Sequence, residues 1–259
     1  MGKPVLNKNQ GNQTVLSVNL NKIALLRNSR GRDFPSVLAF AKQTIESGVK
    51  GITIHPRPDE RHIRRQDARD LAALVAQYES VELNIEGYPD ETFIELIAAT
   101  QPHQVTLVPD GLHQITSDHG WNLEKDLDAL KEACARLTPY AGRIAVFVDP
   151  SADLSELAGL CQRVELYTEA YARACASDTE QEANISRILS TYEATAVQAQ
   201  SLGLGVNAGH DLDLNNLARF LQIPGILEVS IGHSLTVEAL QHGWNNVIQR
   251  YLLICSQAG

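Results

Sequence analysis

The sequence contains few cysteines, and they form no pattern that is typical of a metal or redox site. Only four occur in 259 residues, with no Cys-x-x-Cys spacing and no His partner pattern. We interpret them as reduced residues that pack as small apolar side chains. No His-x-His, His-Glu-x-x-His or His-carboxylate triplet occurs at ligand spacing, so no metal is expected. The four cysteines are Cys134, Cys161, Cys175 and Cys255.

Long apolar runs and an excess of positive charge are also missing. No segment approaches the roughly 18 apolar residues that a membrane-spanning helix needs, and residues 1–13 are polar, unlike a signal peptide. The net charge of −9 argues against a nucleic-acid binder, which needs a basic face to neutralise phosphates. We therefore expect a cytoplasmic protein with no membrane or nucleic-acid partner. A small anion could still bind where a few cations gather.

What the sequence does contain is a regular alternation of strand-like and helix-like segments. Eight short apolar runs, several of them rich in Val and Ile, are typical of buried parallel strands. Eight strand–helix units in 259 residues, with no linker or change of composition between them, favour a closed (β/α)8 barrel, or TIM barrel. The predicted strands are Val15–Leu20, Gly51–His55, Val81–Glu86, Gln104–Val108, Arg143–Val148, Arg163–Leu166, Leu204–Asn207 and Ile226–Ile231.

The segments between these runs show helical periodicity. We expect residues 1–13 to form a flexible leader and residues 14–259 to form a single barrel domain. An open, doubly wound sheet is the alternative, and it would require one or two of the short strands to be false. No Gly-rich nucleotide motif follows the first strand. The predicted helices are Phe34–Ser47, Gln66–Gln77, Asp90–Ala99, Asn122–Leu137, Leu154–Cys161, Thr179–Leu202, Asp213–Leu221 and Thr236–Cys255, with caps at Asp90, Ser151 and Asp213 and ends at Gly48 and Gly203.

Polar side chains recur where the predicted strands end, and in a barrel of this kind those ends form one mouth. Glu86 closes an apolar strand, where desolvation raises a carboxyl pKa towards useful acid/base chemistry. For Glu165, a structural ion pair and a functional role are about equally supported. A single His is more often structural, but four recur at strand ends: His55, His62, His210 and His233. The histidines interpreted as structural are His103, His113, His119 and His242.

Glycines follow the last two predicted strands. Each stands directly before a strand-end His: Gly209 before His210 and Gly232 before His233. Glycine at such a point lets main-chain N–H groups approach a phosphate, which barrel enzymes often bind there. A tight turn that requires positive φ is the alternative for either glycine alone. Two such turns on neighbouring strands favour a phosphate site.

Six blocks of sequence resemble the pyridoxine 5′-phosphate synthase family, in order and at suitable spacing, from about residue 15 to the C-terminus. The resemblance implies a (β/α)8 barrel without a metal or organic cofactor. It implies condensation of 1-deoxy-D-xylulose 5-phosphate with 3-amino-2-oxopropyl phosphate to pyridoxine 5′-phosphate, phosphate and water. It also implies a homo-octamer. The blocks are SVNLNKIALLRNSRG, GITIHPRPDERHIR, NIEGYP, LVPD…QIT, GLGVNAGHDL and EVSIGHSL.

The resemblance also implies roles for individual residues. His55, Glu86 and His210 match the proton-transfer positions of the family, and at Asp211 the family usually has Gly, so a main-chain contact is expected there. The positions that match the aminoketone phosphate site are Asn19, Arg27, Asp211, Gly232 and His233. Those that match the deoxyxylulose phosphate site are Asn21, Lys22, Arg57, His62 and Thr116.

One departure from the family concerns the first strand, where many members have Asn-x-Asp-His and this chain has Asn19-Leu20-Asn21-Lys22. The change removes a charge and replaces a titratable ring with a fixed cation. Two other functions stay open. One is another phosphosugar barrel enzyme, either an epimerase or a Schiff-base aldolase with Lys22 as its lysine. The other is a catalytically silent barrel that binds a B6-type phosphate.

Overall fold

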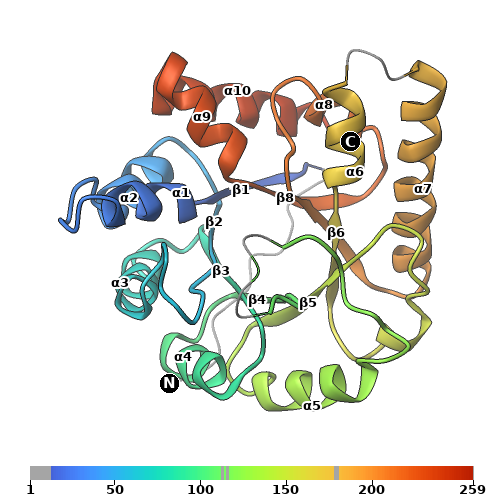
Figure 1. The fold of residues 1–259 in the computed structure, drawn as a ribbon, viewed down its shortest axis with the longest axis horizontal. Helices are drawn as coiled ribbons and strands as arrows, with labels where there is room; N and C mark the ends of the chain where they lie inside the picture. Colours follow the sequence, from blue (N-terminus) through green and yellow to red (C-terminus); the bar gives the residue numbers. More distant parts are fainter. Residues whose placement is uncertain (1–12, 112–113, 115–116, 178–180, 259) are drawn as a thin grey trace.

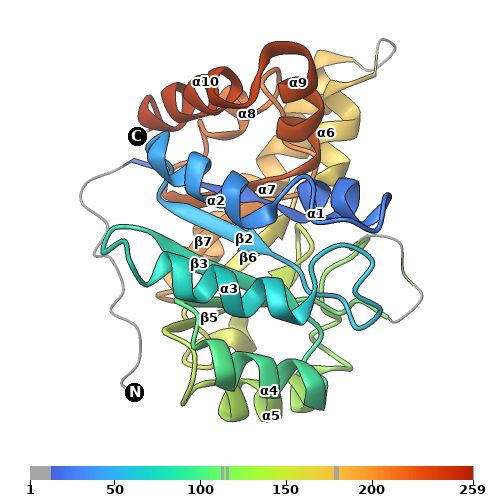
Figure 2. The ribbon, with the colours of Figure 1, turned by 90° about the vertical axis from the view of Figure 1, so that its left-hand side faces the viewer.

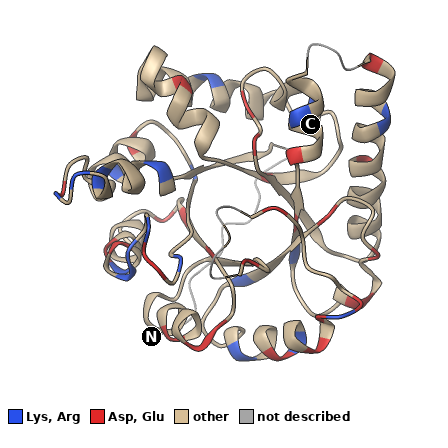
Figure 3. Cartoon of the chain, in the orientation of Figure 1, with Lys and Arg blue, Asp and Glu red and all other residues tan. Residues whose placement is uncertain are grey.

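The computed structural model describes residues 13–111, 114, 117–177 and 181–258. The predicted leader lies outside these ranges except for its last residue, and so do His113 and Thr116. Acidic and basic residues are interspersed over the helices and loops that surround the central sheet (Figure 3). No helix in the described part of the chain is long and apolar enough to cross a membrane.

Eight parallel strands close into a barrel in which each strand pairs with the next along the chain and the last pairs with the first. Figure 1 looks down this barrel, with the helices arranged around it. The closed sheet confirms the predicted (β/α)8 fold, and every predicted strand is present to within two residues at each end. The strands are β1 (Val15–Asn19), β2 (Gly51–Ile54), β3 (Glu82–Gly87), β4 (Gln104–Leu107), β5 (Arg143–Val148), β6 (Arg163–Tyr167), β7 (Gly205–Gly209) and β8 (Ile226–Ile231).

The helices bury their apolar faces against the barrel, and α2, α3 and α4 stack along one side of it (Figure 2). Asp90 caps α4 as predicted, since its side chain accepts a hydrogen bond from the Phe93 N–H. The helices are α1 (Asn21–Asn28), α2 (Val37–Glu46), α3 (Arg65–Val75), α4 (Glu91–Thr100), α5 (Leu127–Leu137), the 3₁₀ turn η1 (Ser155–Leu157), α6 (Glu169–Cys175), α7 (Glu182–Ser201), α8 (Leu217–Phe220), α9 (His233–His242) and α10 (Trp244–Ser256).

Several predicted helix boundaries were wrong. The segment 154–161 forms only the 3₁₀ turn η1, which ends before Gly159 at φ +76°. Gly243, at φ +83°, divides the predicted last helix into α9 and α10. Ser151 has φ +72° and caps no helix. Asp213 caps a turn ahead of the short α8, because its carboxylate accepts from two main-chain N–H groups. Helices α1 and α6 were not predicted.

Candidate active site

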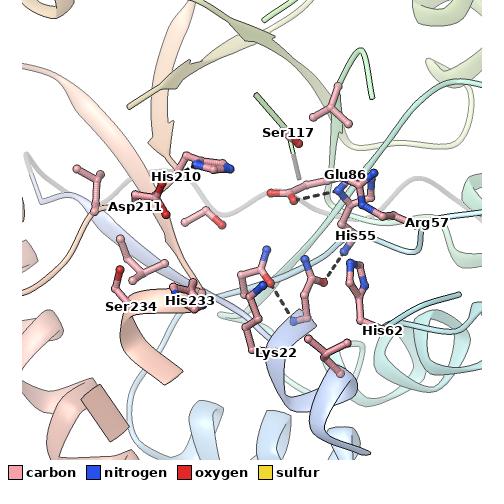
Figure 4. A pocket seen from close by; sticks show the side chains of 18 of the residues that line it. Lys22, His55, Arg57, His62, Glu86, Ser117, His210, Asp211, His233 and Ser234 are labelled. Atoms are coloured by element: carbon pink, nitrogen blue, oxygen red, sulfur yellow. Dashed lines mark hydrogen bonds and ion pairs between the residues drawn. The ribbon is translucent and has the colours of Figure 1, made fainter. Parts of the chain in front are cut away.

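A cavity of about 520 Å³ lies at the carboxyl ends of the strands, where the sequence predicts the working groups. Figure 4 shows its side chains pointing inwards from two opposite walls. Twelve of the fourteen predicted site residues line it: Asn19, Asn21, Lys22, His55, Arg57, His62, Glu86, Glu165, His210, Asp211, Gly232 and His233.

His55 and Glu86 form the first wall. His55 directly follows β2, and its main-chain N–H donates to Asn21 Oδ1 at 2.9 Å, which ties the end of β2 to the start of α1. The Nδ1 atom of His55 lies 3.9 Å from Glu86 Oε2 on β3. Both side chains are largely buried, with exposed fractions of 7% and 13%. The two groups are therefore close enough to exchange a proton after a small shift.

Burial changes the acid/base character of this pair. Burial, and then the negative charges of Glu165 and Asp110, raise the pKa of Glu86 well above its usual value, although Arg57 opposes the shift. Burial, and then the positive charge of Arg57, lower the pKa of His55 well below its usual value. These shifts favour the protonated carboxyl group of Glu86 and the neutral imidazole of His55, so the first can donate a proton and the second can accept one.

Glu165 adds a second buried carboxyl group to the cavity, from β6. Burial, and then the charge of Glu228, raise the pKa of Glu165 to about 8, while a hydrogen bond from Thr106 opposes the shift. Thr106 Oγ1 donates to Glu165 Oε2 at 3.3 Å. Because Glu165 has no ion pair within the described part of the chain, the ion-pair interpretation of this residue is not supported.

Cations line the same wall at the end of β2. Arg57 forms an ion pair with Asp110 and donates to the Gln114 carbonyl at 3.1 Å, and Arg61 donates to that carbonyl at 3.0 Å. Burial, and then the charges of Arg57 and Lys22, lower the pKa of His62 to about 4. His62 Nδ1 accepts from the Ile63 N–H at 2.9 Å. The neutral ring of His62 therefore presents only Nε2 to a ligand as a donor.

His210 forms the opposite wall with Asp211 and His233 (Figure 4). Its ring packs edge-on against Tyr167, with 4.9 Å between the ring centroids. The Nδ1 atom of His210 lies 3.2 Å from Asp211 Oδ2. The chain separates His210 from Glu86 by more than one hundred residues, and the barrel brings both to one cavity.

The two predicted phosphate-site glycines do not have positive φ, so the turn interpretation of them is wrong. Close packing requires glycine instead. A Cβ atom at Gly209 would lie 2.6 Å from Glu165 Oε1, and one at Gly232 would lie 3.0 Å from the Cβ of Asn19. Positive φ occurs at the residues that follow Gly209, namely His210 (φ +94°) and Asp211 (φ +58°).

Arg27 is the one described site residue that the structure places outside the cavity. Its guanidinium forms a bidentate ion pair with Asp67, at 2.5 and 2.8 Å, and it is 3% exposed. Its assignment to the aminoketone phosphate is therefore not supported, because a carboxylate already occupies its donor fork. Thr116, from the deoxyxylulose phosphate set, lies outside the described residues.

Sequence reasoning missed several polar groups of this site, among them Asp110 and Ser117. Asp110 neutralises Arg57 and accepts from Ser117 Oγ at 2.8 Å, while its Oδ1 is buried without a hydrogen-bond partner among the described residues. Ser117 lines the cavity. An Asp directly after a strand-end Pro was the available signal for Asp110. No three His, Cys, Asp or Glu side chains of the described residues are grouped so that they could hold a metal ion.

Comparison with known proteins gives the same family as the sequence motifs. Residues 16–257 match the family described as pyridoxal phosphate biosynthesis protein PdxJ. The chain belongs to this family. A pyridoxine 5′-phosphate synthase of Chelativorans sp. is 47% identical over 246 residues, which cover 93% of this chain and 98% of that one. The enzyme of the same name from Flavobacterium johnsoniae is 48% identical over 242 residues, covering 92% and 98%.

Solved structures of low sequence identity share the fold. The tryptophan synthase alpha chain of Legionella pneumophila superposes with a TM-score of 0.64 at 11% identity, covering 95% of this chain and 93% of that one. A phosphoribosylanthranilate isomerase from Thermotoga maritima gives a TM-score of 0.53 at 11% identity, covering 93% and 98%. At this level of identity the likeness concerns the barrel alone.

Proposed function

We propose that this chain is a pyridoxine 5′-phosphate synthase. It condenses 1-deoxy-D-xylulose 5-phosphate with 3-amino-2-oxopropyl phosphate and releases pyridoxine 5′-phosphate, phosphate and water. The observation that carries the proposal is the convergence of Glu86 and His55 on one wall and His210 on the other wall of a single cavity. Ring formation needs several proton transfers to carbon and oxygen, and groups on two sides of the substrates can supply them.

Glu86 and His55 serve the imine-forming and dehydration steps in this proposal. A carbonyl oxygen leaves as water only after it has gained protons, and the raised pKa of Glu86 keeps a proton available for that transfer. His55, whose pKa is lowered, accepts a proton in return. Glu165 is a third candidate, since its carboxyl group faces the same cavity and holds its proton up to about pH 8. His210 acts from the other wall on the departing hydroxyl or the closing ring.

Two helix N-termini supply the anion sites. Helix α9 begins at His233 and α1 begins at Asn21, and both first turns line the cavity. Main-chain N–H groups at such ends, together with the helix dipole, favour phosphate. The aminoketone phosphate is assigned to Asn19, Gly232, His233 and the main chain of Asp211. The deoxyxylulose phosphate is assigned to Asn21, Lys22, Arg57 and His62, with Thr116 by resemblance alone.

The change to Asn21 and Lys22 is compatible with this assignment. Asn21 positions His55, because its side-chain oxygen accepts the His55 N–H. Lys22 adds a cation to the cavity wall, where it favours a sugar phosphate. Holding both phosphates orients two reactants that would otherwise meet by diffusion.

We extend the proposal to the domain organisation, cellular location, cofactor requirement and oligomeric state of the enzyme. Residues 14–259 form one catalytic domain that works in the cytoplasm with no metal or organic cofactor. The assembly is a homo-octamer by resemblance to the family. Light scattering of the purified protein measures that mass directly.

Purified protein mixed with both phosphorylated substrates tests the function. The synthase forms a pyridoxine-like ultraviolet chromophore, with one phosphate released per product. A Schiff-base aldolase instead gives a borohydride-trapped substrate adduct on Lys22. A silent binding barrel takes up pyridoxine 5′-phosphate in calorimetry but forms no chromophore. Either of the last two results would contradict the proposal.

A further inference from the structure

Asp211 lies in a backbone turn that the surrounding structure holds in an uncommon conformation. Both His210 and Asp211 have positive φ, at +94° and +58°, which is unusual for residues other than glycine. Thr168 Oγ1 donates to the Gly209 and His210 carbonyls at 2.8 and 2.5 Å. Asn216 Nδ2 donates to the Asp211 carbonyl at 3.3 Å. A conformation fixed from two neighbouring elements at a cavity wall points to a local function.

The turn brings the carboxylate of Asp211 to the ring of the preceding residue. Oδ2 of Asp211 lies 3.2 Å from Nδ1 of His210, and the Tyr167 ring fixes the edge of the imidazole. Nδ1 and Nε2 flank the same ring carbon, Cε1, and point in different directions, so a carboxylate held at Nδ1 leaves Nε2 facing elsewhere. With Nδ1 turned to the carboxylate, the ring reaches across the cavity towards the wall that carries Glu86 (Figure 4).

Asp211 remains an anion in this setting. Its hydrogen bond with His210, and then the positive charges of His210, His233 and Lys22, lower the pKa of Asp211, although burial opposes the shift. An anionic carboxylate accepts hydrogen bonds and donates none, so the proton between the two groups belongs to His210 Nδ1. A carboxylate would repel a substrate phosphate, which leaves the main chain of Asp211 for that contact.

We propose that Asp211 is a positioning residue for His210: it accepts a hydrogen bond from Nδ1–H and thereby keeps Nε2 as the nitrogen that exchanges a proton with the substrates. The inference rests on the proposed role of His210 in the synthase reaction. A carboxylate that accepts a hydrogen bond from Nδ1–H fixes both the tautomer and the orientation of a histidine that transfers protons.

Two substitutions at Asp211 separate the effect of its side-chain hydrogen bond from the effect of its backbone conformation. Asn and Gly both tolerate positive φ, so Asp211→Asn and Asp211→Gly should keep the turn. Asn retains a side-chain oxygen acceptor, whereas Gly removes it. Asp118→Asn is the matched control, because Asp118 also contacts the Nδ1 of a neighbouring histidine, His119, but on an exposed loop.

Nitrogen-15 spectra of histidine-labelled, unliganded protein report the tautomer, and a His210→Gln spectrum identifies the signal. We expect the Nδ1–H form in wild type, a shift towards Nε2–H in Asp211→Gly, and partial retention in Asp211→Asn. We expect kcat of Asp211→Gly to fall roughly 10- to 100-fold. This factor corresponds to the net free energy of one hydrogen bond to a charged group. KM should change little, and Asp118→Asn should alter only the His119 signal.

Two results would overturn the inference. One is an unchanged His210 tautomer in Asp211→Gly, and the other is a shifted tautomer with wild-type kcat. Since the spectra need no substrate, they test the hydrogen bond even in protein that shows no turnover. An inactive wild type would count against the proposed synthase function and would be recognised separately.

Discussion

Glu165 lies inside the barrel on β6 and is 3% exposed. Its folded-state pKa of about 8 is well above that of a carboxyl group in an unfolded chain. The folded protein therefore holds a proton here that the unfolded chain releases, and folding loses stability as pH rises from about 4.5 to about 8. Burial of this carboxyl group therefore destabilises the folded protein as pH rises, which is not expected of a residue with a purely structural role.

The amide in Glu165→Gln does not titrate, so this variant should unfold at a higher temperature than wild type at pH 8. Well below pH 4.5 the two proteins should unfold at similar temperatures, because the wild-type carboxyl group is then neutral in both states. Thermal unfolding followed by circular dichroism across this range measures the difference. Glu95→Gln, on the exposed face of α4, is the control. A difference of equal size at both pH values would contradict the raised pKa.

His55 has two separable contributions, one from its main chain and one from its ring. His55→Ala keeps the N–H that bonds to Asn21 but removes the ring beside Glu86. We expect kcat to fall by roughly 10²- to 10⁴-fold, as for loss of a general acid or base, with little change in unfolding temperature. His242→Ala, at an exposed position near the end of α9, should keep full activity. Comparable rates in the two variants would remove His55 from the mechanism.

At the scale of elements, β7 can approach β6 closely only because it ends in glycine. In Gly209→Ala the added Cβ would meet the Glu165 carboxyl, which the Thr106 hydrogen bond holds on its other side. We expect a loss of about 1–3 kcal/mol in the free energy of unfolding, and a lower kcat because the carboxyl group must move. Gly111→Ala, where a Cβ meets no described residue within 4 Å, should leave the stability unchanged. Denaturant titration compares them, and equal stabilities would contradict this packing.

The strands could be predicted from sequence because each is a short apolar run, as in β5, where all six residues are buried. Helix boundaries were predicted less well. Helix α1 starts within the segment that was interpreted as a strand-end loop, so its apolar residues were not considered as a helix. The break between α9 and α10 depends on one glycine with positive φ, which helical periodicity does not reveal.

Much of the candidate site could also be predicted, because residues at strand ends must converge when a barrel closes. The differences between the predicted and the observed site concern residues whose partners are distant in sequence. Arg27 resembles a phosphate ligand until Asp67, forty positions away, is seen to hold its guanidinium. Asp110 was missed because its partner Arg57 is on another strand end. A single sequence does not indicate which charges neutralise each other.

For the molecule as a whole, a buried ionic network holds the amino ends of the strands together. Glu228 on β8 lies 3.3 Å from Arg163 on β6 and 3.5 Å from Arg143 on β5, and Arg143 also pairs with Glu82 on β3. Because the network joins strands that do not pair with one another directly, it contributes to closure of the barrel. The network lies at the amino ends of the strands, and none of its residues lines the cavity at their carboxyl ends.

Removing one anion from this network should destabilise the barrel strongly. Glu228→Gln leaves two buried guanidinium groups with too few partners, and we expect a loss of about 3 kcal/mol or more. Glu91→Gln breaks an ion pair with Arg136 that is exposed, so it should cost less than about 1 kcal/mol. Urea unfolding of both variants measures the contrast. Similar losses would show that the buried network does not hold the barrel closed.

The central claim is that groups on opposite walls of one cavity act on the same pair of substrates. The most direct measurement compares wild type, Glu86→Gln and His210→Gln in the presence of both phosphorylated substrates, following the pyridoxine chromophore and phosphate release together. We expect wild type to form one phosphate per chromophore. Each variant should be slower by roughly 10²-fold or more with its fold intact. Product formation at the wild-type rate by either variant would contradict the account.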